Sequence, residues 1–293
     1  MTDPASEKDA LAIVLDLLKL ERLEVDLFRG VSPDVTSQRV FGGQVIGQAM
    51  MAAYQTVEAR MCHSMHAYFI RPGDPNVPII YQVDHARDGR SFTTRRVVAI
   101  QHGKQIFNLA ASFQVEEEGW FHQIEMPDIP GPEGLRSRLE LREEAKHLFP
   151  EPMRRLMTRA NAIEMRPVNP QNFLDPKPLP ATHHIWFKAQ RPFDDDPIIH
   201  QCLLAYASDM SLLDSGTRPH GISWHTNEAM MASLDHAMWF HAPVRTDEWL
   251  LYTQDSPFAG GARSFNRGMI FKQDGTLVAS VTQEGLMRPR IKK

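Results

Sequence analysis

Three polar side chains in the second half of the sequence stand where apolar residues are expected. Asp209 falls in an apolar run, Gln283 continues the apolar row of a strand, and Ser233 begins another strand of bulky residues. A carboxylate that loses its hydration is costly unless donors surround it. Buried in a cleft, it becomes a candidate general base or water-holder. The competing interpretation is a structural aspartate satisfied by backbone groups or tyrosine hydroxyls.

The element that must position Asp209 is a helix expected over residues 198–213. Asp196 is a good N-cap and Pro197 fits the first helical position. The run that follows is predominantly apolar or small, which predicts a helix buried over most of its surface. Asp209 then lies on one helical stripe with three residues: Cys202, Ala205 and Tyr206.

Two strands must position the amide and the hydroxyl. Alternation from Leu277 places Gln283 on the same face as Ala279 and Val281. Ser233 is expected to open a strand that runs on to Trp239. The closing stretch, residues 249–288, reads as two hydrophobic strands joined through a turn at Asp274-Gly275.

The first half of the chain has a similar plan. The pair Gly42-Gly43 predicts a turn that opens a helix, and no G-x-G-x-x-G fingerprint of a dinucleotide fold is present. Strand-like runs follow at residues 66–71, 79–85, 92–101 and 105–115, and His102-Gly103 is a hairpin signal. One helix followed by a meander of strands describes an α+β unit.

The two halves match each other at nearly constant spacing. His66-Ala67 corresponds to His236-Ala237, and Arg90-Ser91-Phe92 corresponds to Arg263-Ser264-Phe265. The turn at His102-Gly103 corresponds to Asp274-Gly275. Three correspondences in the same order indicate a tandem duplication.

The duplication divides the chain into three parts. Residues 1–115 form the first unit and residues 166–293 form the second, which carries the candidate catalytic residues. Residues 116–165 are expected to be a linker, because acidic residues and prolines follow Val115. A highly charged helix over residues 136–148 is expected within this linker, exposed to solvent.

Composition limits the possible functions. The 293 residues are 42% hydrophobic and 23% charged, with a formal charge of -4, so no broad basic surface for nucleic acid is expected. No apolar run approaches a membrane span. Cys62 and Cys202 form no metal or disulfide pattern and read as buried apolar residues. A cytoplasmic protein without metal is therefore expected.

Several motifs together resemble the type II acyl-CoA thioesterases, the TesB-like family. The resemblance covers nearly the whole chain. It implies a double hotdog fold, with two tandem units that each pack a long helix on an antiparallel sheet. The motifs that carry it are Phe41-Gly42-Gly43-Gln44, Ala205-Tyr206-Ala207-Ser208-Asp209, Leu234-Asp235-His236-Ala237-Met238-Trp239-Phe240-His241, Glu248-Trp249-Leu250-Leu251-Tyr252 and residues 278–288.

The resemblance also implies the catalytic residues. The family uses an aspartate, a threonine or serine, and a glutamine, which map onto Asp209, Ser233 and Gln283. Serine keeps the hydroxyl of the threonine found in many members and loses the methyl group that restricts its rotamer. The first unit has Ala111 opposite Gln283 at an offset of 172 residues, so it is expected to support and to bind substrate.

The implied reaction is hydrolysis of fatty acyl-CoA to free fatty acid and CoA. Water attacks the thioester carbonyl, with Asp209 as general base or orienter while Gln283 and Ser233 hold the water. Attack by Asp209 itself to give an anhydride is a variant. Coenzyme A is part of the substrate and no cofactor is expected. Two hairpin segments are candidates for a CoA phosphate: Gly260, Gly261 and Arg263, and the repeat partner Arg90.

Other function classes remain as alternatives. A hotdog hydratase or dehydratase acting on acyl thioesters requires a catalytic histidine with an acid, for which Asp235-His236 is the candidate. A catalytically silent acyl-CoA binding protein is the second alternative. Metal catalysis is disfavoured, because the odd spacing of His236 and His241 directs them to opposite faces of a strand. Exposed sheet edges predict a homo-oligomer, a dimer or tetramer.

Overall fold

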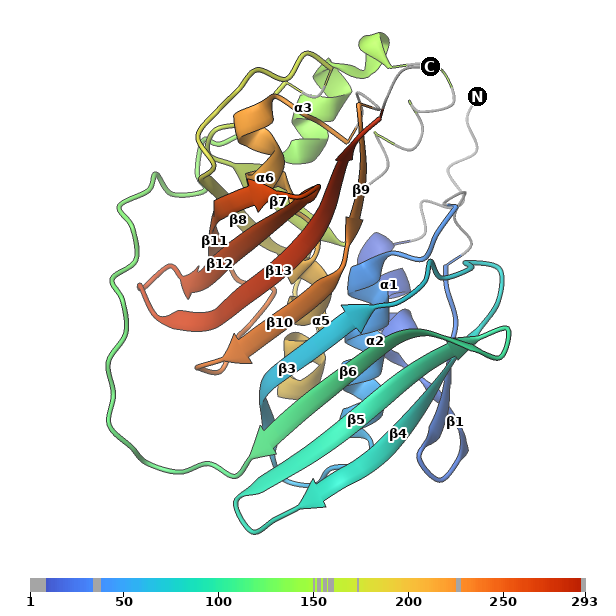
Figure 1. Cartoon of the computed structure of the whole chain (residues 1–293). Coiled ribbons are helices and arrows are strands. Elements are labelled where there is room, and N and C mark those ends of the chain that lie inside the picture. The colour runs from blue at the N-terminus through green and yellow to red at the C-terminus, as the bar shows by residue number, and fades with distance from the viewer. Residues whose placement is uncertain are drawn as a thin grey trace.

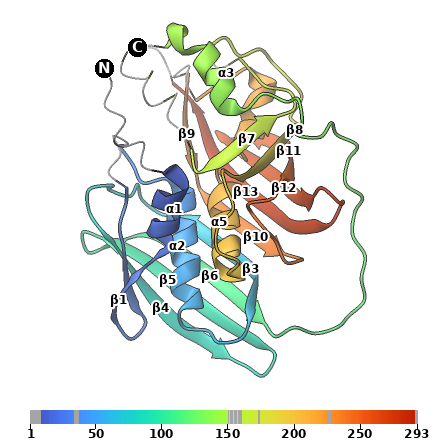
Figure 2. The ribbon, with the colours of Figure 1, turned by 180° about the vertical axis from the view of Figure 1, so that it is seen from behind.

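The computed structural model describes residues 9–33, 38–149, 151, 154, 157, 161–172, 174–224 and 228–290. One antiparallel sheet of 13 strands forms its framework. Long helices lie against one face of this sheet, and the opposite face is open over the first half (Figures 1 and 2). In the second half, Met126 and Ile129 of the connecting segment pack on the opposite face against Trp186, Leu251 and Phe271. Between the halves, residues 115–131 have no regular structure and run along one side of the molecule (Figure 1), where Gln123 bonds Gly275 and the carbonyl of Pro130 accepts from Trp186.

The first half consists of two helices and six strands. Asp9 caps the first helix by accepting hydrogen bonds from the amides of Leu11 and Ala12. The second helix begins at the glycine pair, as predicted. The elements are α1 (Ala10–Leu18), β1 (Glu21–Glu24), β2 (Leu27–Gly30), α2 (Gly42–Tyr54), β3 (Met61–Phe69), β4 (Ile79–Asp88), β5 (Phe92–Gln101) and β6 (Lys104–Gln114).

The second half repeats this pattern after a connecting helix. Asp196 caps the long helix through the amide of Ile198, and Pro197 occupies its first turn, as predicted. The elements are α3 (Arg138–Glu144), β7 (Ile163–Pro167), β8 (His183–Ala189), α5 (Pro197–Ser208), α6 (Asp214–Thr217), β9 (Ala229–Ser233), β10 (Asp235–Phe240), β11 (Leu250–Gly260), β12 (Arg263–Lys272) and β13 (Leu277–Pro289). Short 3-10 turns span Lys146–Leu148 and Arg218–His220.

The order of strands shows the duplication directly. It runs β1-β2-β4-β5-β6-β3 and then β10-β13-β12-β11-β8-β7, with β9 added beside β13. Each half therefore mirrors the other across the junction of β3 and β10. At that junction His236 lies opposite Ala67, and Ala237 lies opposite His66. The segments matched in the sequence are thus neighbours across a pseudo-twofold axis.

The two long helices pack against each other in antiparallel fashion. A Cβ added at Gly43 would lie 2.3 Å from the carbonyl oxygen of Tyr206, so the helices approach here only because residue 43 is glycine. At the other end Tyr54 bonds Gln201. The start of α2 therefore lies beside the end of α5. One continuous apolar core fills the space between these helices and both halves of the sheet.

Three local expectations were wrong, and a fourth is confirmed over a shorter range. Helix α5 ends at Ser208 instead of residue 213, because Asp209 is its C-cap and makes tertiary contacts. Ser233 ends β9 instead of opening β10. Residues 249–288 hold three strands, because Gly261 and Ala262 adopt positive φ and form a further hairpin turn. The charged helix is confirmed, over Arg138–Glu144 only.

Candidate active site

A cavity of about 720 Å³ opens where α2 begins and α5 ends. Its wall combines residues of both halves of the chain with residues of the connecting segment. The start of α2 contributes Phe41 and Gly42, the end of α5 contributes Asp209, and the end of β9 contributes Ser233. The duplication therefore creates this site at the junction of its two copies.

Asp209 is held at the wall of the cavity by three donors. The hydroxyl of Ser233 donates to Oδ1 of Asp209 at 3.2 Å, and Nε2 of Gln283 donates to the same oxygen at 2.6 Å. The backbone amide of Gly43 adds a third hydrogen bond to this carboxylate. The structure thus brings together the three residues that the sequence singled out, from α5, β9 and β13.

The second carboxylate oxygen of Asp209 lies against the start of α2. A Cβ added at Gly42 would be 2.6 Å from Oδ2 and 2.9 Å from a ring carbon of Phe69. No larger residue fits there without displacing the carboxylate. The glycine pair predicted as a helix start therefore has a second purpose, which is to let the helix approach the acid.

Burial changes the acidity of Asp209. Loss of hydration raises its pKa from 3.8 to about 6, against the lowering effect of the bonds from Gln283, Ser233 and Gly43. A carboxylate with this pKa is ionised at neutral pH and accepts a proton more readily than an exposed aspartate does. These are the properties of a general base matched to physiological pH.

Gln283 differs from its two partners in its exposure. It is 0% exposed and does not line the cavity, whereas Asp209 and Ser233 both do. Its buried position on the row with Ala279 and Val281 confirms the predicted alternation of β13. Because its amide reaches the cavity only through Asp209, it fixes the orientation of the carboxylate in this arrangement.

The lining of the cavity is partly apolar and partly cationic. Its apolar side chains include four of the first unit: Val45, Phe69, Ile106 and Phe107. Arg39 and Arg71 also line it and are exposed. Arg138, Arg142 and Arg218 line it as well, and Arg138 pairs with Asp214 at 3.2 Å.

These arginines were missed in the sequence. The segment that carries Arg138 and Arg142 was expected to be a solvated helix, yet these two residues turn toward the cavity. Their spacing of four residues places them on one helical face, which is the signal that was available. A charged helix can therefore line a pocket with one face and meet solvent with the other.

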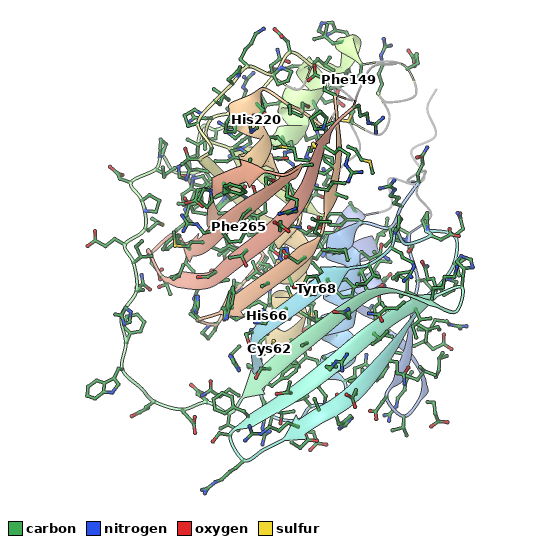
Figure 3. All side chains as sticks on the ribbon, viewed as in Figure 1. Cys62, His66, Tyr68, Phe149, His220 and Phe265 are labelled. Carbon is green, nitrogen blue, oxygen red and sulfur yellow. The ribbon has the colours of Figure 1, made fainter. Side chains whose placement is uncertain are left out.

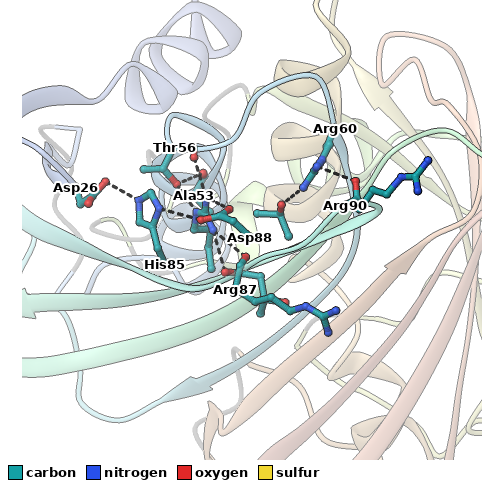
Figure 4. A network of polar contacts seen from close by, with 11 residues as sticks. Asp26, Ala53, Thr56, Arg60, His85, Arg87, Asp88 and Arg90 are labelled. Atoms are coloured by element: carbon teal, nitrogen blue, oxygen red, sulfur yellow. Dashed lines mark hydrogen bonds and ion pairs between the residues drawn. The ribbon is translucent and has the colours of Figure 1, made fainter.

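The four residues proposed for a CoA phosphate lie elsewhere. Gly260, Gly261 and Arg263 form the β11-β12 hairpin, and Arg263 pairs with Glu284 at 2.8 Å. Arg90 lies in the β4-β5 hairpin, where its carbonyl accepts a hydrogen bond from Arg60 (Figure 4). None of the four lines the described cavity.

The alternative pair Asp235-His236 is not assembled for chemistry. Asp235 accepts the backbone amide of Glu284 at 2.6 Å, while Nε2 of His236 lies 2.9 Å from the hydroxyl of Ser208. His236 is 0% exposed and does not line the cavity. A hydratase mechanism requires this histidine beside the substrate, and the buried position of His236 away from the cavity does not support it.

The two cysteines and the histidines His63 and His241, which the sequence left as open candidates, have structural surroundings in the described part of the chain. Cys62 and Cys202 are free and buried, as predicted. His63 and His241 bond the hydroxyls of Ser112 and Ser280, respectively. No group of metal-ligating side chains gathers within the described ranges. The described helices include none that is long and apolar enough to span a membrane.

Two family models match the chain. The model for acyl-CoA thioesterase matches residues 157–286, and that for the acyl-CoA thioesterase N-terminal domain matches residues 31–114. Human acyl-coenzyme A thioesterase 8 is 40% identical over 94% of this chain and 89% of its own length. Acyl-CoA thioesterase 2 of Haemophilus influenzae is 40% identical over 96% of this chain and 98% of its own.

Solved structures give the same result for the fold. Acyl-CoA thioesterase II TesB2 of Mycobacterium marinum is 42% identical, with a TM-score of 0.78 over 94% of this chain and 98% of its own. A conserved protein with a hot dog fold from Alicyclobacillus acidocaldarius is 20% identical, with a TM-score of 0.75 over 95% of this chain and 98% of its own. The predicted α+β double hotdog architecture is confirmed.

Proposed function

The chain belongs to the acyl-CoA thioesterase family, and from this premise we propose that Asp209, Ser233 and Gln283 carry the hydrolysis of acyl-CoA. The products are a carboxylic acid and CoA. One observation carries the assignment of residues: a carboxylate with a pKa of about 6 is held at the cavity wall by a hydroxyl and an amide.

In the proposed step, Asp209 accepts a proton from water while the water oxygen attacks the thioester carbonyl. The C–S bond then breaks, the proton held by Asp209 passes to the leaving sulfur, CoA leaves as the thiol, and the carboxylic acid remains. Ser233 lies at the cavity wall and helps to hold the water. Gln283 keeps Oδ1 of Asp209 occupied, which leaves Oδ2 for the water. Because thioesters are already reactive, placement supplies much of the effect.

The start of α2 is a suitable place for the thioester carbonyl. A helix N-terminus carries partial positive charge and amides that point away from the helix. This end of α2 meets the cavity beside Asp209 through Gly42. A carbonyl oxygen there would be polarised as negative charge develops on it.

The cavity also supports a placement of the two parts of the substrate. The apolar region with Val45, Phe69 and Phe107 suits a hydrocarbon chain. The arginines in its lining suit phosphate groups, since guanidinium binds them in bidentate fashion. We assign the CoA phosphates to these arginines in preference to the hairpin residues Gly260, Gly261, Arg263 and Arg90.

The direct test measures thiol release from acyl-CoAs of graded chain length with a thiol reagent. Steady release that follows the fatty acid formed mole for mole is expected. A hydratase would change the acyl chain without releasing thiol. A binding protein would retain acyl-CoA with no turnover, and either result would refute the proposal.

Attack by Asp209 is tested by a single turnover in oxygen-18 water with enzyme in excess. Direct water attack at the thioester places the label in the first acid formed and leaves Asp209 unlabelled. In the anhydride route, Asp209 forms a C–O bond to the acyl carbon as CoA leaves, and water that opens the anhydride at the aspartyl carbon places the label in Asp209. Opening at the acyl carbon gives the same labelling as direct attack. Label in the Asp209 peptide after one turnover would establish that route.

Three further properties belong to the proposal. We infer a role in lipid metabolism in the cytoplasm, which the two free, buried cysteines support. The reaction needs no cofactor, because water and the named side chains supply every atom and proton. A homo-oligomer is supported by the edge strand β1, which is exposed along its whole length. Light scattering of the purified chain measures this state.

A further inference from the structure

We propose that His236 is a positioning residue that sets the orientation of the Gln283 amide and, through it, of Asp209. The inference rests on the proposed function, because it adds to the same site a residue that acts on Gln283. His236 touches neither the cavity nor Asp209. Its effect on the reaction therefore passes entirely through Gln283.

The sheet places these two side chains together. Strands β10 and β13 pair Met238 with Val281 and Ala237 with Thr282, so the next step of the register sets His236 beside Gln283. Both side chains are 0% exposed. A polar group buried this completely must find its partners within the protein or remain unsatisfied.

The bond to Asp209 fixes which way the amide of Gln283 points. An ionised carboxylate can only accept hydrogen bonds, so the group 2.6 Å from Oδ1 is the nitrogen of the amide. The oxygen Oε1 then faces away from Asp209. A flipped amide would set Oε1 against the carboxylate, with two acceptors facing each other in a buried site.

Two unpaired atoms of His236 and Gln283 complement each other. Nδ1 of His236 and Oε1 of Gln283 are both buried, and neither has a hydrogen-bond partner among the described residues. A proton on Nδ1 would make each atom the partner of the other. Gln283 also raises the pKa of His236 by hydrogen bonding, which an acceptor does and a donor does not. The donor at this contact is therefore Nδ1–H.

This assignment fixes the tautomer of the imidazole. Burial lowers the pKa of His236 to about 4, so the ring is neutral at pH 7 and carries one N–H. The hydroxyl of Ser208 lies 2.8 Å from the carbonyl oxygen of Ala205 and 2.9 Å from Nε2 of His236, and with the proton on Nδ1 we assign the hydroxyl proton to Nε2. Donors then run in one direction, from Ser208 through His236 and Gln283 to Asp209.

The first test reads the tautomer directly in the resting enzyme. Nitrogen-15 histidine labelling and NMR distinguish Nδ1–H from Nε2–H, and His236→Asn identifies the signal of residue 236. A neutral Nδ1–H ring at pH 7 is expected. An Nε2–H ring, or a charged one, would overturn the proposal whether or not the protein is active.

The second test uses kinetics. His236→Leu removes the donor, and a decrease in kcat of roughly 10- to 100-fold with KM little changed is expected, since small misplacements of a reacting group cost up to about 100-fold. His236→Asn keeps an N–H near the position of Nδ1 and should recover much of the loss. An equal decrease in kcat in His236→Leu and His236→Asn would show that the N–H donor of residue 236 has no role.

A double-mutant cycle shows whether the effect passes through Gln283. In the Gln283→Ala background, His236→Leu should change kcat by less than about twofold, because the group it positions is gone. Additive losses would contradict the proposal. Wild-type turnover with full activity of His236→Leu would refute this inference while leaving the proposed function intact.

His200 supplies the matched control for the loss of a buried imidazole. It is 1% exposed, lies near the start of α5, and has Nδ1 bonded to Thr246 at 3.0 Å and Nε2 without a partner in the described part of the chain. His200→Leu should lower thermal stability about as much as His236→Leu while leaving kcat within about twofold. An equal decrease in kcat in His200→Leu would show that the loss of any buried imidazole lowers kcat, so that the effect is not specific to His236.

Discussion

The two copies of the repeat end their central helices in opposite ways. After α2, the guanidinium of Arg95 donates to the carbonyl and the hydroxyl of Thr56 at 3.1 and 2.9 Å and pairs with Asp88 (Figure 4). After α5, the carboxylate of Asp209 occupies the C-cap. The end of a helix carries partial negative charge and favours a cation. The first copy follows this rule, and the second departs from it.

The strands beside these helix ends differ in the same way. In the first copy Ala111 of β6 lies opposite Met65 and Arg95. In the second copy Gln283 of β13 lies opposite Asn266 and beside His236. Where the first copy has two apolar residues beside a structural arginine, the second copy has a buried polar network around the acid Asp209. Departures from stability rules of this kind are expected where function resides.

Among variants that keep Asp209, Gln283→Ala should show the largest decrease in kcat. Gln283→Ala deletes the donor 2.6 Å from Oδ1 and is expected to lower kcat roughly 100- to 1,000-fold, as loss of a preorganised donor does. Thr282→Val, on the other face of β13, is the control. An unchanged kcat in Gln283→Ala would remove the functional difference between the two copies.

The contribution of the first copy to the site is tested at Gly42. Gly42→Ala would bring a Cβ to 2.6 Å from Oδ2 of Asp209, so the carboxylate must shift. A decrease in kcat of roughly 10- to 100-fold is expected. Gly119→Ala adds a Cβ with nothing within 4 Å and should be silent. Full activity of Gly42→Ala would mean that the approach of α2 is not needed.

The raised pKa of Asp209 predicts the acid limb of the pH profile. The base must be ionised, so kcat/KM should fall about tenfold per pH unit below a midpoint near 6. A midpoint near 4 would show an ordinary exposed carboxylate. Rates with a thioester substrate between pH 4.5 and 8 measure it.

The same shift links Asp209 to stability. Its pKa rises from 3.8 to about 6 on folding, so its protonation stabilises the fold below pH 4. That contribution is lost as the pH rises through 6. Asp209→Asn does not titrate and should gain up to about 3 kcal/mol relative to wild type between pH 4 and 8. Urea unfolding at both pH values tests the sign.

The smallest effect on activity is expected at the counterpart in the first copy. Arg95→Met leaves the end of α2 and Asp88 without their buried donor and should lower stability by about 1–3 kcal/mol. Turnover should stay within about twofold at a temperature where the variant is folded. Arg96→Met, on the exposed face of β5, should change stability by less than about 0.5 kcal/mol. A large loss of kcat in Arg95→Met would assign chemistry to the first copy.

The sequence predicts the framework of the molecule well, because local signals and tertiary packing agree there. The starts of α2 and α5 follow from Gly42 and from the cap at Asp196. Side-chain alternation places Gln283 inside, and the repeat predicts the hairpin turns at His102-Gly103 and Asp274-Gly275. The resemblance to a family supplies the grouping of Asp209 with Ser233 and Gln283, since no local pattern connects three elements.

The remaining features depend on contacts distant in sequence. The helix pattern continues past Ser208, but the bonds from Ser233 and Gln283 stop α5 at Asp209. Asp235 was the candidate partner of His236 in the sequence, and the fold gives His236 a contact with Ser208 instead. The open face of the sheet carries His66 and Tyr68, the latter 59% exposed (Figure 3). Alternation predicts such a face, but only the fold shows that the described chain leaves it uncovered.

The central claim is that the carboxylate of Asp209 in the second copy activates the water. The measurement is thiol release from an acyl-CoA by Asp209→Asn beside wild type, at pH 8 and with thermal stability measured on the same samples. We expect kcat to fall roughly 1,000-fold while stability is equal or higher. Full turnover by a folded Asp209→Asn protein would contradict the account.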